Sequence, residues 1–269
     1  MTELFHYTTL KGCRGIIESN RLWATRSDCL NDTSETTVYK QPFAQEIRSA
    51  IFKICESSDK PYDVDKEVGI FIDAHHEAFC RALGDIFITS FCKHNNEFIR
   101  QHGLLSMWRS YADGGVALVL DEEKLNEDLK NCFNCKVEYI SDNSERHYVK
   151  AAGAFFHNLE SSHIDHLIKD KNFIEAMRNM TVGCKHYGFH EEIEHRYIVS
   201  DSTRYEEKIY TNNDGKTKIY IELRVNITKD LVKEIIVGPG RLQTENHKAI
   251  IAMTKDLNIK ITKSGIPYQ

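Results

Sequence analysis

The sequence has few prolines, few glycines and no long apolar run, and each scarcity excludes a class of protein. Its 269 residues include 4 Pro and 14 Gly, which argues against long disordered linkers and collagen-like repeats. No apolar stretch approaches the roughly 20 residues of a membrane-spanning helix. Residues 1–6 lack the basic and apolar regions of a signal peptide. We therefore expect a cytoplasmic protein without a membrane segment.

An excess of positive charge is also missing. Lys and Arg number 35 against 40 Asp and Glu, so the formal charge is −5, whereas a protein that coats nucleic acid along its length is strongly basic. The hydrophobic share of 41% and the charged share of 28% are those of an ordinary soluble globular protein. A chain of this length buries a core without disulfide or metal staples. We expect one domain over residues 1–269.

Cysteine is present, but a second metal-binding pair is not. The eight cysteines include one C-x-x-C pair, Cys132 and Cys135, and a structural zinc site normally needs two such pairs. Most of the others lie in apolar stretches, where a buried thiol is the ordinary role. The sequence therefore predicts no metal site and reduced thiols.

Hydrophobic periodicity predicts an α+β fold with a curved, mostly antiparallel sheet and flanking helices. A strand at 4–8, a helix ending near Asn20 and a strand at 21–25 open the chain. Further strands are expected at 86–92, 116–120, 136–140, 193–199, 208–225 (a hairpin), 232–237 and 259–261. Helices are expected at 104–112, 146–183 and from about 241 to 255, with a helical insertion at about 34–83.

Two short patterns carry possible chemistry. On the first strand, His6 and Thr8 point to one face and Tyr7 to the other, so an imidazole and a hydroxyl lie side by side. They suit a polar ligand laid across the strand. The alternative is a histidine at a strand end followed by a threonine that caps the next helix.

The second pattern is the row Glu192, Glu194 and Arg196. Strand geometry from Glu192 onward places all three on one face. Neighbouring carboxylates raise each other's pKa, and the guanidinium lowers both. Such a row can hold a sugar hydroxyl and stabilise developing positive charge. The alternative is a solvated strand face with a salt bridge.

Two aromatic residues, Trp108 and Tyr111, are three positions apart and share one face of a predicted helix. They suit stacking on a flat ring, although aromatic residues at this spacing commonly belong to the core.

Together, the ordered motifs resemble a large prokaryotic family of unassigned function whose members often occur near phage-defence genes. They are His6-Tyr7-Thr8, Leu22-Trp23-Ala24, Leu30-Asn31-Asp32-x-x-Glu35, Ser90-Phe91, Met107-Trp108-x-x-Tyr111-Ala112, Glu192-x-Glu194-x-Arg196 and residues 234–239. One departure is Phe189, where that family more often has Trp. This family in turn distantly resembles ADP-ribosyltransferases.

The resemblance implies a fold and a set of roles. It implies an ADP-ribosyltransferase-like domain that uses NAD as substrate. The NAD-binding residues would be His6, Tyr7, Thr8, Ser90, Trp108, Tyr111 and Arg196. Glu194 would be the catalytic carboxylate, with Glu192 nearer the acceptor, and His6 and Glu194 would converge on one cleft.

The function that follows is ADP-ribosyl transfer to a nucleic-acid or protein acceptor, in a toxin or an antiviral defence effector with a possible neutralising or regulatory partner protein. Two alternatives stay open. One is an NAD glycohydrolase. The other is a non-catalytic module that senses a nucleotide or a phage protein.

Overall fold

The computed structural model describes residues 2–30, 86–140, 182–200, 202–211 and 215–267, with scattered positions between 48 and 73. The chain divides into two compact units. The first comprises Met1–Thr25, Phe87–Lys136 and Glu191–Gln269, and the second comprises Arg26–Ile86 and Val137–His190. The insertion expected at about 34–83 and the helix expected at 146–183 lie almost entirely outside the described residues. The expectation of a single domain therefore stays a prediction.

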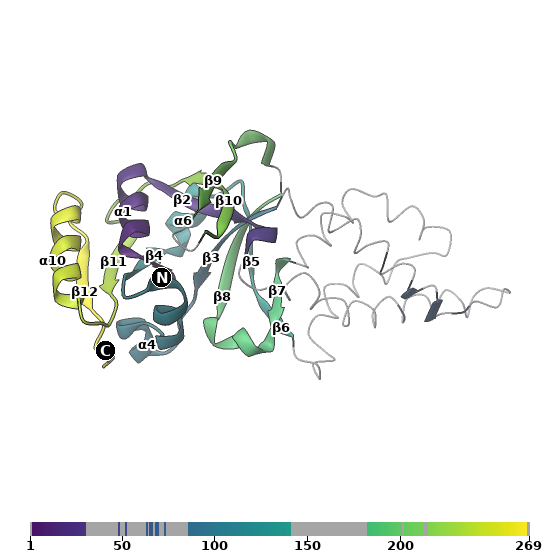
Figure 1. Ribbon diagram of the computed structural model, residues 1–269, viewed down its shortest axis with the longest axis horizontal. Coiled ribbons are helices and arrows are strands. Elements are labelled where there is room, and N and C mark those ends of the chain that lie inside the picture. The colour runs from purple at the N-terminus through teal and green to yellow at the C-terminus, as the bar shows by residue number, and fades with distance from the viewer. Residues whose placement is uncertain are drawn as a thin grey trace. The chain divides into compact units, whose positions relative to one another are not determined.

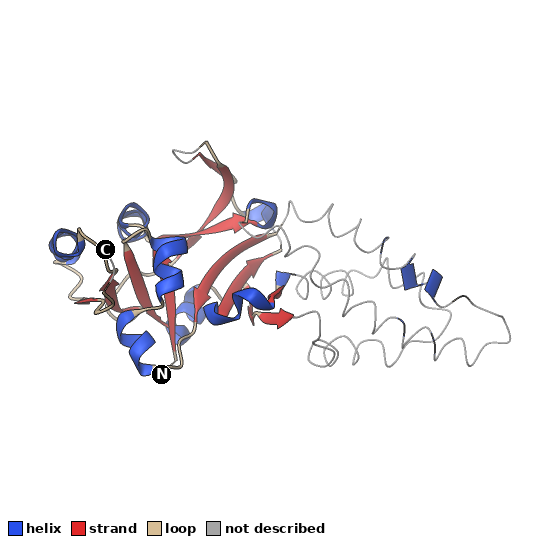
Figure 2. Ribbon diagram, turned by 60° about the horizontal axis from the view of Figure 1, so that its bottom comes forward, coloured by secondary structure: helices blue, strands red, loops and turns tan. Residues whose placement is uncertain are grey.

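The first unit is built on a mixed, mostly antiparallel sheet with helices on both sides of its strands (Figures 1 and 2). The strands are β1 (Glu3–Thr8), β2 (Arg21–Arg26), β3 (Phe87–Cys92), β4 (Val116–Asp121), β5 (Phe133–Lys136), β8 (Glu194–Val199), β9 (Lys208–Thr211), β10 (Thr217–Arg224), β11 (Val232–Val237) and β12 (Lys260–Lys263). The helices are α1 (Leu10–Ser19), α4 (Glu97–His102), α5 (Leu105–Met107), a π-helix (Trp108–Ala112), α6 (Glu122–Asp128) and α10 (Gln243–Thr254). The expected α+β class with a mostly antiparallel sheet is confirmed.

The opening β1–α1–β2 segment follows local signals in the sequence. The Thr9 side chain begins α1 by accepting a hydrogen bond from the Gly12 N–H at 3.1 Å, which satisfies one of the free donors of the first turn. Asn20 ends the helix at φ 55°, in the left-handed conformation common at helix ends. Cys13 and Ile16 are the buried residues of α1. The strand–helix–strand arrangement expected for residues 4–25 is confirmed.

Strand β3 has three neighbours in the sheet. The main strand order is β12-β11-β4-β1-β3-β2-β10-β9, and β8 and β5 branch from it at β3. β8 pairs with β3 along its whole length, from Phe87↔Val199 to Cys92↔Glu194. β1 and β2 therefore share the other edge of β3, and β1 meets it at its carboxyl end through Phe5↔Cys92.

The two faces of the sheet carry separate apolar clusters. On the face that we call the α1 face, Leu4 and Tyr197 pack with residues of α1, α6 and α10. On the opposite face, the α5 face, Phe5 and Val119 pack with residues of α5 and the π-helix. Side chains alternate along a strand, and directly paired residues share a face. The register therefore assigns each candidate site residue to one of the two faces.

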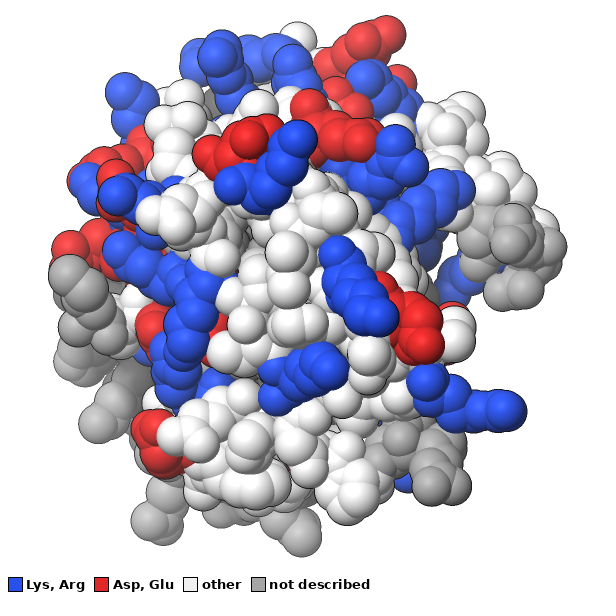
Figure 3. All heavy atoms as spheres, turned by 90° about the vertical axis from the view of Figure 1, so that its left-hand side faces the viewer, with Lys and Arg blue, Asp and Glu red and all other residues white. Residues whose placement is uncertain are grey.

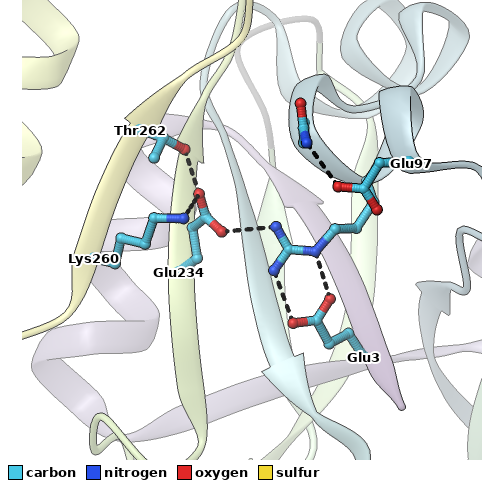
Figure 4. A network of polar contacts seen from close by, with 7 residues as sticks. Glu3, Glu97, Glu234, Lys260 and Thr262 are labelled. Carbon is cyan, nitrogen blue, oxygen red and sulfur yellow. Dashed lines mark hydrogen bonds and ion pairs between the residues drawn. The ribbon is translucent and has the colours of Figure 1, made fainter. Parts of the chain in front are cut away.

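An ion-pair network joins α4 to three strands of the sheet (Figure 4). Arg100 donates two hydrogen bonds to the carboxylate of Glu3 on β1, at 2.8 and 2.9 Å, and a third to Glu234 on β11 at 3.1 Å. Glu234 also accepts from Thr262 and pairs with Lys260, both on β12. Burial raises the pKa of the Glu234 carboxyl, but the hydrogen bond from Thr262 and the two cations outweigh it and hold this pKa below its usual value. The network anchors α4 to the α5 face.

Helix α10 connects the parallel strands β11 and β12. Seen from the side that carries α10 and β12, side chains of both charge signs surround an area without charged residues (Figure 3). None of the described helices is both long and apolar enough to cross a membrane.

The described part of the second unit contains a small parallel sheet of β6 (Glu138–Ile140) and β7 (Cys184–His186). A 3-10 helix follows at Tyr187–Glu192. The prediction of a single strand over residues 136–140 is therefore wrong. The chain forms β5 in the main sheet and then β6 in the small one, and Val137, between them, is fully buried.

Candidate functional site

Glu194 and Arg196 form a buried ion pair on β8. The Arg196 Nε and Nη2 atoms donate to the two carboxylate oxygens of Glu194 at 2.8 and 3.1 Å, and the two residues are 4% and 1% exposed. Two parallel bonds fix the plane of the carboxylate as well as its position. Their Coulomb attraction in this interior is offset by the cost of removing both charges from water. The pair therefore holds the carboxylate rigidly. It is a salt bridge, but a buried one and not part of a solvated strand face.

Glu192 does not belong to the same strand row. β8 begins at Glu194, because Ile193 adopts φ 45°, a left-handed conformation that strands do not contain and that is rare for a β-branched residue. Glu192 instead ends the 3-10 helix, is 8% exposed and accepts a hydrogen bond from the Tyr111 hydroxyl at 3.3 Å. The expected strand geometry from Glu192 onward is corrected: the left-handed residue turns one carboxylate out of the row.

The register places Glu194 and Arg196 on the α5 face. Glu194 pairs with Cys92 and Arg196 with Ser90 on β3, and Cys92 belongs to the apolar cluster of that face. On the other side of β8, Cys135 of β5 pairs with Arg196. The ion pair is thus flanked by Ser90 and two cysteines on a sheet surface that is apolar only in part.

Tyr7 shares this face and is fixed by hydrogen bonds. Its hydroxyl oxygen accepts from the Leu104 backbone N–H at 2.9 Å and is 2.8 Å from His94 Nε2. Burial raises the pKa of Tyr7 and lowers that of His94 to about 4, so both groups are neutral at pH 7. Tyr7 therefore connects the Leu104 backbone N–H to the His94 ring through two hydrogen bonds. This chain of donors and acceptors holds the phenol ring in one orientation.

Trp108 lies inside the cluster on the α5 face. It is 1% exposed, its ring meets Tyr7 edge-on at 4.8 Å, and its Nε1–H donates to the His102 carbonyl at 2.9 Å. Gly103 and Gly238 leave room for the ring, since a Cβ at either would lie within 3 Å of it. The helix expected over 104–112 is interrupted here by the π-helix. Trp108 has no exposed ring face on which a ligand can stack, so the structure gives it a packing role.

His6 and Thr8 lie on the other side of the sheet. His6 pairs with Leu118, and its ring contacts Phe91 at 5.3 Å, both of which belong to the α1 face. Since a carbonyl only accepts, His6 Nδ1–H donates to Ser90 O at 3.1 Å, and burial lowers the pKa of the ring. The expected convergence of His6 with Glu194 on one cleft is therefore corrected. Alternation along β1 also places Thr8 on the α1 face, and Thr9 caps α1.

The predicted residues fall into two groups. Seven lie on the α5 face or beside it: Tyr7, Ser90, Trp108, Tyr111, Glu192, Glu194 and Arg196. The other two, His6 and Thr8, lie on the α1 face. Sequence reasoning missed Cys92, which period-two alternation from Ser90 already places next to the site. It also missed Cys135, because no strand was expected at 133–136.

Among the described residues, no group of three His, Cys, Asp or Glu side chains is arranged to hold a metal ion. Cys132 packs against the cluster of the α1 face, where burial raises its pKa to about 11.

No curated protein matches the chain. Residues 107–197, which contain Trp108, Tyr111, Glu192, Glu194 and Arg196, match the model of a family described as a protein of unknown function, DUF2971. The part of the chain that supplies both candidate carboxylates is thus similar to an unassigned family.

Proposed function

We propose that the protein cleaves the bond between nicotinamide and ribose in NAD and transfers the ADP-ribosyl group to an acceptor. The observation that carries this proposal is the fixed Glu194 carboxylate, which lies on the same face as Ser90 and Tyr7, with a second carboxylate, Glu192, two residues before it. A rigid carboxylate suits a reaction that develops positive charge on a sugar.

In the proposed reaction, the bond from ribose C1′ to the nicotinamide nitrogen breaks, and nicotinamide leaves with the electron pair. Glu194 lies beside the ribose and stabilises the oxocarbenium-like transition state. An acceptor oxygen or nitrogen adds to C1′ and gives its proton to Glu192. If water is the acceptor, the same steps hydrolyse NAD.

The aromatic residues differ in their fitness to bind nicotinamide. Trp108 and Tyr7 are 1% and 6% exposed, and both rings are packed in the cluster. Tyr111 packs against that cluster and is only partly buried, and its hydroxyl donates to Glu192. We assign the stacking role to Tyr111, and Ser90 takes the place that His6 was expected to fill on the ligand side.

Nicotinamide release from NAD by the purified protein tests this proposal. Glu194→Gln should lower the rate per folded molecule by about a hundredfold or more, by analogy with the loss of one preorganised stabilising group. Glu234→Gln is the matched control, because Glu234 is also a buried, ion-paired carboxylate of the sheet but belongs to the Arg100 network. Equal losses in both variants would refute a catalytic role for Glu194.

Glu192→Gln separates the two carboxylates. We expect this variant to bind NAD and retain hydrolysis in part, while transfer to an added protein or nucleic-acid acceptor falls. Loss of hydrolysis equal to that of Glu194→Gln would instead make the two carboxylates one catalytic unit.

A second function is favoured by the ion pair itself, since both Glu194 oxygens accept from Arg196 and hold the carboxylate in a buried position. A nucleotide-sensing module needs such a pair for rigidity and needs no turnover. Saturable NAD binding by calorimetry without nicotinamide release would support the module. Defence or toxin activity, with a neutralising partner protein, is part of the enzyme proposal and is tested by growth arrest on expression of the wild type but not of Glu194→Gln.

A further inference from the structure

Three aromatic residues form a cluster on the outward side of β2, β10 and β9, which are neighbours in the sheet (Figure 1). Trp23 stacks on Tyr220 with ring centroids 4.0 Å apart and an interplanar angle of 23°, and Tyr210 meets Trp23 at 5.5 Å. Tyr220 is 9% exposed, whereas Trp23 is 45% exposed. Tyr220 occupies one face of the indole, so the exposed area of Trp23 is mainly its opposite face.

Packing of the core does not require this arrangement. Leu22 and Ala24 of β2 and Leu223 of β10 belong to the cluster of the α1 face, and alternation points Trp23 and Tyr220 the other way. The Trp23 ring is exposed to water on one face and supported by Tyr220 on the other, so it can accept a stacked ring without rearrangement. Aromatic rings displayed in this way are typical of interaction surfaces.

Cations surround the aromatic cluster. The outward rows of the three strands carry Arg21, Lys208, Lys218 and Arg224, as the register with Trp23, Tyr220 and Tyr210 shows. Lys11 Nζ lies 5.4 Å from the Tyr210 ring centroid. Two described carboxylates lie nearby. Glu222 pairs with Lys208 at 2.9 Å and lies 3.5 Å from Arg21. Glu206 is close enough to Lys208 to raise the pKa of its ammonium group. Among the side chains that the structure describes around this cluster, these five cations outnumber the two carboxylates, although the chain as a whole is acidic.

We propose that this surface, the Trp23 platform (Trp23, Tyr210 and Tyr220 with the cations around them), binds single-stranded nucleic acid. A nucleobase stacks on the open face of Trp23, and the flanking lysines and arginines contact the phosphates. Aromatic platforms beside basic side chains are how proteins bind single strands without reading their sequence. A duplex does not offer the face of a base, so it fits this surface poorly. The proposal does not depend on NAD chemistry.

The test uses the full-length protein and fluorescently labelled oligothymidylate and oligoadenylate of about 15 nucleotides, a length within the range that one such site covers. Fluorescence anisotropy gives the affinity at several salt concentrations. Trp23→Ala should weaken binding by about tenfold or more, the loss typical of one stacking residue. Phe98→Ala is the matched control, because Phe98 is an exposed aromatic residue at 59% on α4, and its removal should leave the affinity unchanged.

Two further readouts locate the site. The chain has two tryptophans, and Trp108 is buried, so an oligonucleotide that stacks on Trp23 should quench the fluorescence of the wild type but not that of Trp23→Phe. Replacement of Lys208 and Lys218 by Gln should lower the slope of log affinity against log salt by about 1.4, since each phosphate contact to a single strand contributes about 0.7.

The proposal is overturned by any of three results: no saturable binding at low salt, equal affinity of wild type and Trp23→Ala, or tighter binding of a matched duplex than of the single strand. Binding of a protein to this face that is lost in Trp23→Ala, without oligonucleotide binding, would assign the platform to a protein partner instead. None of these results depends on whether NAD is cleaved.

Discussion

The side chain of His6 provides a hydrogen bond to the backbone carbonyl of Ser90, 84 residues later in the chain, at 3.1 Å. β1 pairs with β3 through Phe5↔Cys92, so this imidazole extends the connection between the two strands. His6, which the sequence analysis assigned to a ligand site, therefore helps to connect β1 to β3.

Replacement of His6 tests this structural role. His6→Ala leaves the Ser90 carbonyl without its side-chain donor, and we expect a loss of about 1–3 kcal/mol in the free energy of unfolding. His6→Gln keeps an N–H donor and should recover part of the loss. Urea denaturation measures both. A loss in NAD affinity without a loss in stability would contradict this structural role and show that His6 contributes to NAD binding.

Acid should destabilise the protein through its buried histidines. His94 has a folded-state pKa of about 4, against about 6.5 in the unfolded chain, so the unfolded state binds more protons between these values. The contribution of neutral, buried His94 to the free energy of unfolding is fully present above pH 6.5. It decreases as the pH falls, by about 2 kcal/mol at pH 5. Burial lowers the pKa of His6 and His195 as well.

The measurement is the urea midpoint at pH 7 and at pH 5. His94→Gln, whose amide can still form a hydrogen bond with Tyr7 but does not titrate, should show a smaller decline than the wild type. His247→Gln on α10 is the control and should decline as the wild type does. An equal decline in all three proteins would exclude His94 as the source.

The buried ion pair should cost more to break than to remove. Arg196→Met leaves the Glu194 charge buried without its guanidinium, for which we expect a loss of about 3–5 kcal/mol. Glu194→Met combined with Arg196→Met removes both charges and should be more stable than Arg196→Met alone. A double-mutant cycle by urea denaturation gives the coupling free energy, and additive effects would show that the pair does not act as a unit.

Ile193 holds an unfavourable backbone conformation between the two carboxylates. A β-branched residue at φ 45° costs on the order of 1–3 kcal/mol in conformational energy. Ile193→Gly removes this strain but also the apolar side chain, so we expect a stability within about 1 kcal/mol of the wild type. Ile193→Ala loses side-chain contacts but keeps part of the backbone strain, because alanine also disfavours a positive φ. This variant should be less stable than Ile193→Gly. The reverse order in thermal denaturation would contradict stored strain.

Limited proteolysis tests the single-domain prediction. The loop between β9 and β10 contains Asn212, Asn213, Asp214 and Gly215, of which the first three lie outside the described residues. Exposed loop tips are cut most readily, so we expect the first cut here and one remaining compact species. Two stable halves that separate on a sizing column would refute the prediction.

Local signals predicted the parts of the fold that local physics decides. At the ends of α1, where a capping threonine and Asn20 were expected, one side chain and one φ value determine the boundaries. Period-two alternation correctly placed Glu194 and Arg196 on one face of a strand, because both lie on the same strand.

The errors arose where one strand must be related to another. Alternation tells which residues of β1 share a face, but not which face of β8 that corresponds to, since the register between strands almost 190 positions apart is set by tertiary packing. His6 was therefore placed on the wrong side. Trp108 was a similar case: helical spacing shows that it shares a face with Tyr111, and the small Gly103 and Gly238 beside it, which make room for its ring, are known only from the structure.

The three neighbours of β3 have a consequence for the order in which the chain folds. β1 and β2 come from the first 26 residues, β3 ends at Cys92, and β8 ends at Val199. During synthesis, β1 and β2 emerge before β3, with which they share an edge. The strand that pairs with the other edge of β3, β8, is made more than a hundred residues after β3. A sheet that depends on contacts this distant in sequence folds slowly. Strand β3 is mostly apolar and has one edge without a partner until β8 is made, so this edge is a site of aggregation in the nascent chain.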